Sequence, residues 1–175
     1  MAFWVTLIAS MITGGLAGAL VRYVLDKRRE QIAYTMKLHE QWWSEEFQRM
    51  RRAVFELVSD FSAAGGPGEK SLEFLAQFQH EGRFEHPAGP AFVRIVFFFS
   101  DLNACLDKKV VDKRLAYRLF GESQYFWFEP LIDAVRDKVK RNPQVRWAWE
   151  INSLSSKFTK IKERDERRHA KQLLK

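Results

Sequence analysis

The amino-terminal 25 residues most constrain how this chain can fold. The first 21 carry no charged side chain, and the apolar character continues to Leu25. At about 1.5 Å per helical residue, residues 2–25 span about 36 Å, which exceeds the roughly 30 Å hydrocarbon core of a bilayer. Trp4 and Tyr23 stand near the two ends, where interfacial aromatic side chains are common. We therefore expect a transmembrane helix in this segment.

Two alternatives to an anchor are a cleaved signal peptide and a buried helix of a soluble protein. Ala17-Gly18-Ala19 resembles a signal-peptide cleavage site, but a signal peptide carries its positive charge before the apolar run. Here the cations follow it: Arg22, Lys27, Arg28 and Arg29. This order favours an anchor and puts the basic flank inside. We expect a single-pass protein of the cell (inner) membrane with its amino terminus outside and residues 26–175 cytoplasmic.

Small side chains recur along one face of the predicted anchor. They are Thr6, Ser10, Gly14 and Gly18, spaced four residues apart. The last two form a GxxxG motif, which lets two helix backbones approach closely in a membrane. The pattern predicts self-association or pairing with a partner membrane protein, although small residues are also common in membrane helices that do not pair.

The rest of the chain predicts an all-α fold, with apolar residues at helical spacing and no strand-like alternation. We divide the chain into an anchor (1–25), a juxtamembrane amphipathic helix (26–62), a helical core (63–142) and a carboxy-terminal helix with a basic tail (143–175). The juxtamembrane stripe comprises Ile32, Met36, Trp43, Phe47, Met50, Val54, Leu57 and Phe61. Apolar residues cover most of the circumference of the helix expected around residues 92–106, which predicts a central position.

Several residues predict where elements begin and end. The stretch 63–68 is rich in Gly and breaks the long helix, and 86–90 is a second loop. Asp112 can cap a helix that ends at Gly121, and Asn142-Pro143 can start the last helix. The single cysteine, Cys105, is expected to be a buried free thiol, as in a reducing compartment.

The order of landmarks resembles an uncharacterised bacterial family of small, single-pass, all-helical membrane proteins. The landmarks are the run 93–99 with its aromatic residues, the turn Lys109-Val110-Val111-Asp112, Leu119-Phe120-Gly121 and Tyr125-Phe126-Trp127. The resemblance implies the helical, membrane-tethered fold and brings no activity with it.

Residues with catalytic or metal-binding chemistry are sparse. Gly65 to Ser71 imitates a phosphate-binding loop, but Glu69 separates the last glycine from the lysine, and no strand precedes it. The four histidines are scattered, and one cysteine cannot complete the usual zinc sets. Asp101 and Asn103, within the most apolar helix, either lie on its narrow polar face or mark a site. We predict no catalytic residue, metal or cofactor.

The carboxy-terminal tail is basic, with Lys160, Lys162, Arg164, Arg167 and Arg168 interleaved with three acids. It can be a solvated helix end, or it can contact lipid headgroups or an acidic protein. Nucleic acid is the least favoured partner, because no aromatic residue follows Phe158 to stack on bases.

These features favour an interaction function over an enzymatic one. We predict a membrane-anchored helical interaction or scaffold module, an accessory subunit of a membrane complex. Its docking surfaces would be the small-residue face and the juxtamembrane helix with Trp42 and Trp43. The alternative is a membrane-bound effector or enzyme whose helical domain binds a ligand or nucleic acid.

Overall fold

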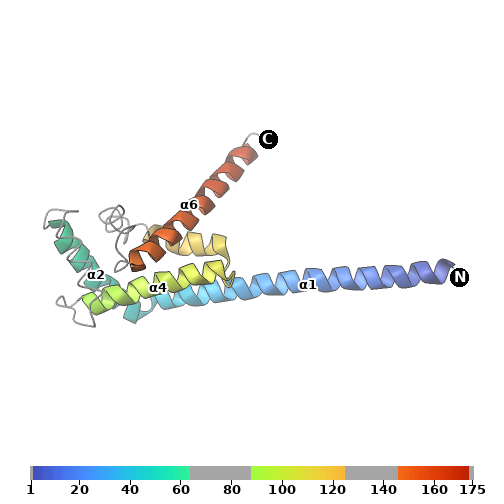
Figure 1. The fold of residues 1–175 in the computed structure, drawn as a ribbon, viewed down its shortest axis with the longest axis horizontal. Coiled ribbons are helices and arrows are strands. Elements are labelled where there is room, and N and C mark those ends of the chain that lie inside the picture. The colour runs from blue at the N-terminus through green and yellow to red at the C-terminus, as the bar shows by residue number, and fades with distance from the viewer. Residues whose placement is uncertain (1, 64–87, 125–145, 174–175) are drawn as a thin grey trace.

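The computed structural model describes residues 2–63, 88–124 and 146–173, and the side chains described are those of residues 17–56, 88–124, 149–168, 170 and 172. All the regular structure in these ranges is helical, as predicted (Figure 1). The labelled helices are α1 (Ala2–Trp43), α2 (Glu45–Ala63), α4 (Gly89–Asp107) and α6 (Arg146–Leu173). A further helical segment, 113–124, follows α4.

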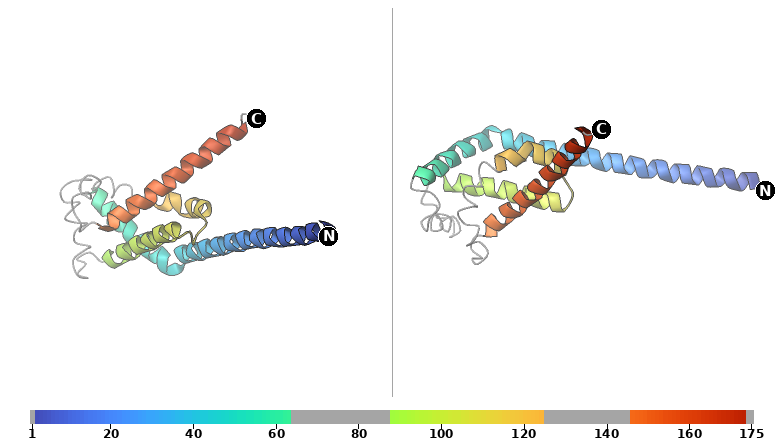
Figure 2. Two further views of the ribbon diagram at one scale, coloured as in Figure 1. Left: turned by 45° about the vertical axis from the view of Figure 1, so that its right-hand side comes forward. Right: turned by 90° about the horizontal axis from the view of Figure 1, so that it is seen from above.

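The first helix is continuous from the apolar segment into the bundle. α1 contains 42 residues and is therefore about 63 Å long. Its amino-terminal half extends away from the other helices, while its carboxy-terminal part lies beside α4 (Figures 1 and 2). All of residues 17–30 are exposed, and burial begins at Gln31.

The single juxtamembrane helix predicted from Asp26 to about Phe61 is divided at Ser44. The Ser44 carbonyl accepts the Gln48 N–H at 2.9 Å, and its hydroxyl accepts the Phe47 N–H at 3.4 Å, so this residue caps α2. Glu45 and Glu46 follow in the first turn of α2, where carboxylates stabilise the helix dipole. Ser-Glu-Glu is thus a helix-start signal inside the apolar stripe.

The break at Ser44 also changes which face of α1 is buried. Of the predicted stripe, Ile32, Met36 and Trp43 are exposed. The residues that turn inward are Thr35 and Trp42, both 0% exposed, with the half-buried Leu38 between them. The prediction was wrong here because it extended the phase of Phe47, Met50 and Val54 across a helix end, where the phase is not preserved.

α4 is the central helix, as predicted. It packs against both α2 and α6. Of the predicted inward residues, Leu106 is half-buried and the others are buried: Phe92, Ile95, Val96, Phe99 and Leu102. Phe98 is buried too, and its ring stacks on that of Trp42 at 5.1 Å. Phe97, by contrast, is 63% exposed, so the apolar surface of α4 leaves one side open.

A tight turn joins α4 to the helical segment 113–124 and fixes both to α1. Lys109 adopts a left-handed conformation (φ 55°), and the Val110 N–H returns to the Cys105 carbonyl at 2.9 Å. Asp112 caps the next helix as predicted, since its Oδ1 accepts the backbone N–H groups of Arg114 and Leu115 at 3.0 and 2.9 Å.

Gly121 has a different role from the one predicted. The helical segment continues through Gly121 to residue 124, so this glycine does not terminate it. A Cβ at Gly121 would lie 2.8 Å from the Tyr117 ring, so the glycine makes room for that aromatic side chain. The Tyr117 ring in turn packs on Phe158 of α6, 5.7 Å between centroids.

α6 carries the predicted apolar face over its first half. Ile151, Leu154 and Phe158 are buried, and Ile161 is half-buried against the core. Beyond Ile161 the helix projects from the bundle on the same side as the free half of α1 (Figures 1 and 2). The predicted loops at 63–68 and 86–90 fall mostly outside the described residues, and the predicted helix start at Asn142-Pro143 lies wholly outside them.

Candidate functional site

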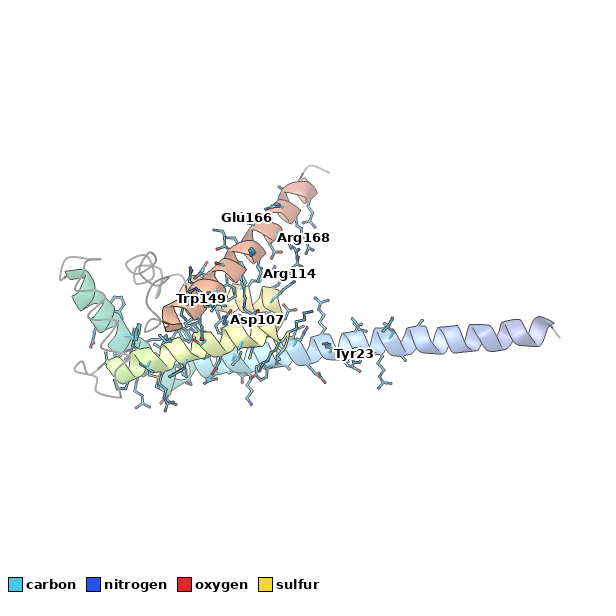
Figure 3. All side chains as sticks on the ribbon, viewed as in Figure 1. Tyr23, Asp107, Arg114, Trp149, Glu166 and Arg168 are labelled. Carbon is cyan, nitrogen blue, oxygen red and sulfur yellow. The ribbon has the colours of Figure 1, made fainter. Side chains whose placement is uncertain are left out.

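The predicted tail cations do not lie on an isolated helix end; most of them line a groove. The groove has a volume of about 970 Å³ and lies between α6 and the start of the segment 113–124. α6 contributes Lys157, Lys160, Arg164, Arg167 and Arg168, and the segment contributes Lys113 and Arg114. We call this feature the basic groove. Figure 3 shows Arg114 and Arg168 between α6 and α1.

The sequence did not indicate two of these cations, and one of the predicted tail cations lies outside the groove. Lys113 and Arg114 are more than forty residues from the tail, and only the packing of α6 brings them beside it. Lys162, predicted with the tail, is exposed and does not line the groove. Its position in the helix turns it away from Arg164, whereas residues 160, 164 and 168 share one face.

Ion pairs hold the groove walls together. Arg114 Nη2 lies 3.0 Å from Asp165 Oδ1 and joins the segment 113–124 to α6. Lys157 Nζ donates to Asp107 Oδ1 at 2.6 Å and to Asn103 Oδ1 at 2.7 Å, and so joins α6 to α4. Arg167 pairs within α6 with Glu163 at 3.3 Å. These contacts make the groove a defined surface instead of a freely moving tail.

Four cations of the basic groove remain without a carboxylate partner within the described part of the chain. They are Lys113, Lys160, Arg164 and Arg168. All four are exposed. Seven cationic side chains and two carboxylates line the groove in total. It therefore has an uncompensated positive potential and suits an anion.

The other two predicted polar residues, Asp101 and Asn103, lie in different surroundings. Asp101 is exposed on the polar side of α4, as one of the two alternatives predicted. Asn103 is 8% exposed, and Lys157 donates to its side-chain oxygen. A buried amide that has found a charged partner is a structural tie, so these two residues do not form the polar pocket that would favour an enzyme.

The predicted cations beside the anchor lie on the exposed part of α1. Arg22 and Arg29 lie 3.8 and 3.7 Å from Asp26, and the Lys27 ammonium lies 5.9 Å from the centre of the Tyr23 ring. Exposed pairs of this kind contribute little to stability in water. Arg28 has no ion pair among the described residues.

The small-residue face of α1 is described at one position. A Cβ added at Gly18 would meet nothing within 4 Å, so nothing in the described part of the chain requires a glycine there. Thr6, Ser10 and Gly14 lie within α1, but their side chains are outside those described.

The two tryptophans predicted to form a docking surface, Trp42 and Trp43, also differ in their exposure. Trp42 is 0% exposed and belongs to the aromatic core, so it cannot meet a partner. Trp43 is 53% exposed. Arg51 lies between them, with its guanidinium 4.9 Å from the Trp42 ring centre and 4.6 Å from that of Trp43. Burial lowers the pKa of Arg51 from its ordinary value.

One helix among the described side chains, which exclude residues 2–16, is long and apolar enough to cross a membrane. It is α4, and 44% of its apolar window is buried inside the protein, whereas most of the apolar part of α1 lies outside the described side chains. The core helix of a soluble domain passes the same test of length and composition. The packing of α4 between α2 and α6 is that of such a core helix.

The remaining sequence signals for chemistry add nothing to the basic groove. The loop from Gly65 to Ser71 and the histidines at 80 and 86 lie outside the described residues. Among the residues that are described, no three His, Cys, Asp or Glu side chains lie close enough to hold a metal ion. His39 accepts a hydrogen bond from Trp43 Nε1 at 2.8 Å.

Comparison of the chain with protein-family models, with curated proteins and with solved structures finds no match in any of the three.

Proposed function

We propose that this protein is a membrane-anchored helical interaction module that presents its bundle at the cytoplasmic face of the cell membrane. The observation that carries the proposal is the contrast within α1. The most apolar part of the chain continues into residues 17–30, which are exposed on every side. Only the carboxy-terminal part of the same helix, from Gln31 onward, packs on the bundle.

Water is an unfavourable surrounding for such a segment. Leu20, Val21, Val24 and Leu25 are each at least 50% exposed. An apolar surface left so open on a monomer marks contact with a membrane or with another protein. The length of residues 2–25 matches a bilayer, and a helix satisfies its own backbone hydrogen bonds in lipid. The four cations from Arg22 to Arg29 lie at the carboxy-terminal end of this segment and directly after it, and they favour a cytoplasmic bundle.

The interaction part of the proposal rests on the small-residue face. A Cβ at Gly18 meets nothing in the described part of the chain, so this position is open to close approach by a neighbouring helix. We propose that the face formed by Thr6, Ser10, Gly14 and Gly18 pairs with a second copy or with a partner membrane protein, which makes the chain an accessory subunit of a membrane complex.

Cross-linking of the full chain in native membranes, followed by purification in mild detergent, tests this function. We expect a defined cross-linked species that Gly18→Ile abolishes and Ala19→Ile, on another face of the helix, leaves intact. If the unaltered chain is a monomer without partners, both in native membranes and in detergent, the interaction module is refuted. Extraction of the chain into the soluble fraction by alkaline carbonate would refute the anchor.

A further inference from the structure

The basic groove lies close to the level at which α1 would leave the membrane. The turn after α4 is tied to α1 at two points. Gln31 Nε2 donates to the Lys109 carbonyl at 2.7 Å, and the Asp112 N–H donates to Thr35 Oγ1 at 3.0 Å. Lys113 and Arg114 of the groove follow this turn directly. The position of the groove along α1 is therefore fixed by hydrogen bonds.

The distance from this turn to the apolar segment is short. Gln31 is six positions after Leu25, which corresponds to a rise of about 9 Å. The headgroup region of one leaflet is roughly 5–8 Å thick, and the Debye length at physiological salt is about 8 Å. Lysine and arginine side chains at this turn can therefore reach the headgroups and lie within the range of their charge.

The second wall of the groove extends toward the same surface. α6 leaves the bundle on the side from which the free half of α1 emerges, in both the first view and the two rotated ones (Figures 1 and 2). Tyr23, Arg114 and Arg168 all lie on this side (Figure 3). The half of α6 beyond Ile161 is thus directed toward the membrane and not away from it.

The chemistry of the groove selects phosphate. Arg164 and Arg168 offer planar guanidinium forks, which bind phosphate oxygens in pairs, and Lys113 and Lys160 supply point charges. None of the four has a carboxylate partner among the described residues. Meanwhile the Arg114–Asp165 ion pair keeps the two walls together without an anion. The groove is thus formed before a ligand arrives.

We propose that the basic groove binds the phosphate of an anionic lipid headgroup, so that α6 forms a second attachment of the bundle to the membrane. The proposal rests on the anchoring of α1, which brings headgroups within reach. It gives the bundle a fixed orientation on the surface, since a single helix alone leaves rotation and tilt open. A nucleic acid or an acidic protein segment would be a different ligand, and a comparison of neutral with anionic membranes distinguishes both of them from lipid.

The test measures hydrogen exchange along α6 in the full chain inserted into lipid nanodiscs. One set of discs contains phosphatidylcholine alone, and the other adds phosphatidylglycerol or phosphatidic acid. Flotation with neutral vesicles first establishes that α1 inserts. We expect slower exchange over residues 159–172 in anionic discs. Arg164→Gln removes a charged hydrogen-bond donor to the headgroup phosphate, so it should reduce the lipid-dependent slowing by about tenfold or more.

Lys162→Gln is the matched control, because it removes one charge from the same helix outside the groove. It should change the slowing less than twofold. Equal effects of Arg164→Gln and Lys162→Gln would indicate unspecific attraction of a basic helix and would overturn the groove. Equal exchange in neutral and anionic discs would overturn lipid binding and leave an acidic protein or nucleic acid as the ligand.

A third arm separates headgroup from free phosphate. Millimolar inorganic phosphate added to neutral discs should leave exchange in α6 unchanged; if it reproduces the slowing, the ligand is a soluble phosphate and the lipid assignment is wrong. Failure of the chain to float would overturn the proposed anchor and this inference together. Flotation without lipid-dependent slowing would overturn this inference alone.

Discussion

The two parts of α1 differ in what surrounds them, although one uninterrupted helix contains both. Residues 17–30 are exposed on all sides, whereas from Gln31 to Trp43 one face packs on the bundle. The exposed part follows directly from the most apolar stretch of the chain, and the packed part is amphipathic. In a globular protein the apolar part would be the one that is buried. The reversal supports lipid as the surroundings of the free part.

The free end of α6 offers a second comparison with the free part of α1. It too extends beyond the bundle, but Lys160, Lys162 and their charged neighbours are exposed there, and such a surface is stable in water (Figure 1). The free part of α1 and the free end of α6 both extend beyond the core. They differ in composition, since the first is apolar and suits lipid, while the second is charged and suits water. The difference between the parts of α1 can be tested by substitutions in each.

The largest effect is expected in the packed part, at Trp42. Its ring contacts those of Phe47, Phe98 and Phe99 at 5.1–5.9 Å between centroids. Trp42→Ala should lower the free energy of unfolding by about 3–5 kcal/mol, because it leaves a cavity in the core. Denaturant unfolding in detergent, followed by circular dichroism, measures this.

Two controls accompany Trp42→Ala. Trp43→Ala, at the exposed neighbour, should cost less than about 1 kcal/mol. Trp42→Phe should cost less than Trp42→Ala, since Nε1 is buried without an acceptor among the described residues and its removal relieves an unsatisfied donor. Similar costs for Trp42→Ala and Trp43→Ala would contradict the difference between the two faces.

In the free part the matching change is Ile12→Lys, near the middle of the apolar segment. A lysine at the centre of a membrane helix costs about 3 kcal/mol in insertion. We expect the membrane-bound fraction in flotation to fall, with the bundle still folded by circular dichroism. Phe97→Lys, at an exposed apolar residue of the bundle, should leave flotation unchanged. A loss of the bundle fold with Ile12→Lys would show that this segment packs on protein.

A smaller effect is expected at Thr35, where α1 meets the turn before the segment 113–124. Its hydroxyl donates to the Gln31 carbonyl at 2.6 Å and accepts the Asp112 N–H. Thr35→Val leaves that N–H without its acceptor and should cost about 1–3 kcal/mol in unfolding. Thr35→Ser keeps the hydroxyl and should cost less; equal costs would mean that packing and not the hydrogen bond decides.

The helices were more predictable from sequence than their contacts. Helical spacing identified α4 as central and the apolar face of α6, because burial along one helix follows a fixed period. The same rule failed at Thr35 and Trp42, since Ser44 ends the helix and the period restarts. For the basic groove, sequence supplied Lys160, Arg164, Arg167 and Arg168. It could not supply Lys113 and Arg114, because a long-range contact leaves no local pattern.

The smallest effect concerns Tyr34, on the side of α1 that meets α4. The negative charge of the Cys105 thiolate is the main cause that raises the pKa of Tyr34 above its ordinary value of 10.0, followed by burial, a hydrogen bond with Cys105 and the charge of Asp101. A raised pKa means that the folded state holds the phenolic proton more tightly than the unfolded chain. The resulting stability is present below about pH 10 and is lost as the pH rises through the raised pKa. Ultraviolet difference titration against Tyr34→Phe measures the midpoint.

Removing the two charges separately should rank their effects on Tyr34. Cys105→Ala should shift the midpoint downward more than Asp101→Asn does, because the thiol supplies both the largest charge effect and a hydrogen bond. An equal shift from both variants would contradict the larger effect of Cys105, and only a small shift from either would mean that burial dominates at this contact. Since Cys105 is on α4, a shift on its removal would also verify in solution that the packed part of α1 lies against that helix, whereas the free part has no such neighbour to report.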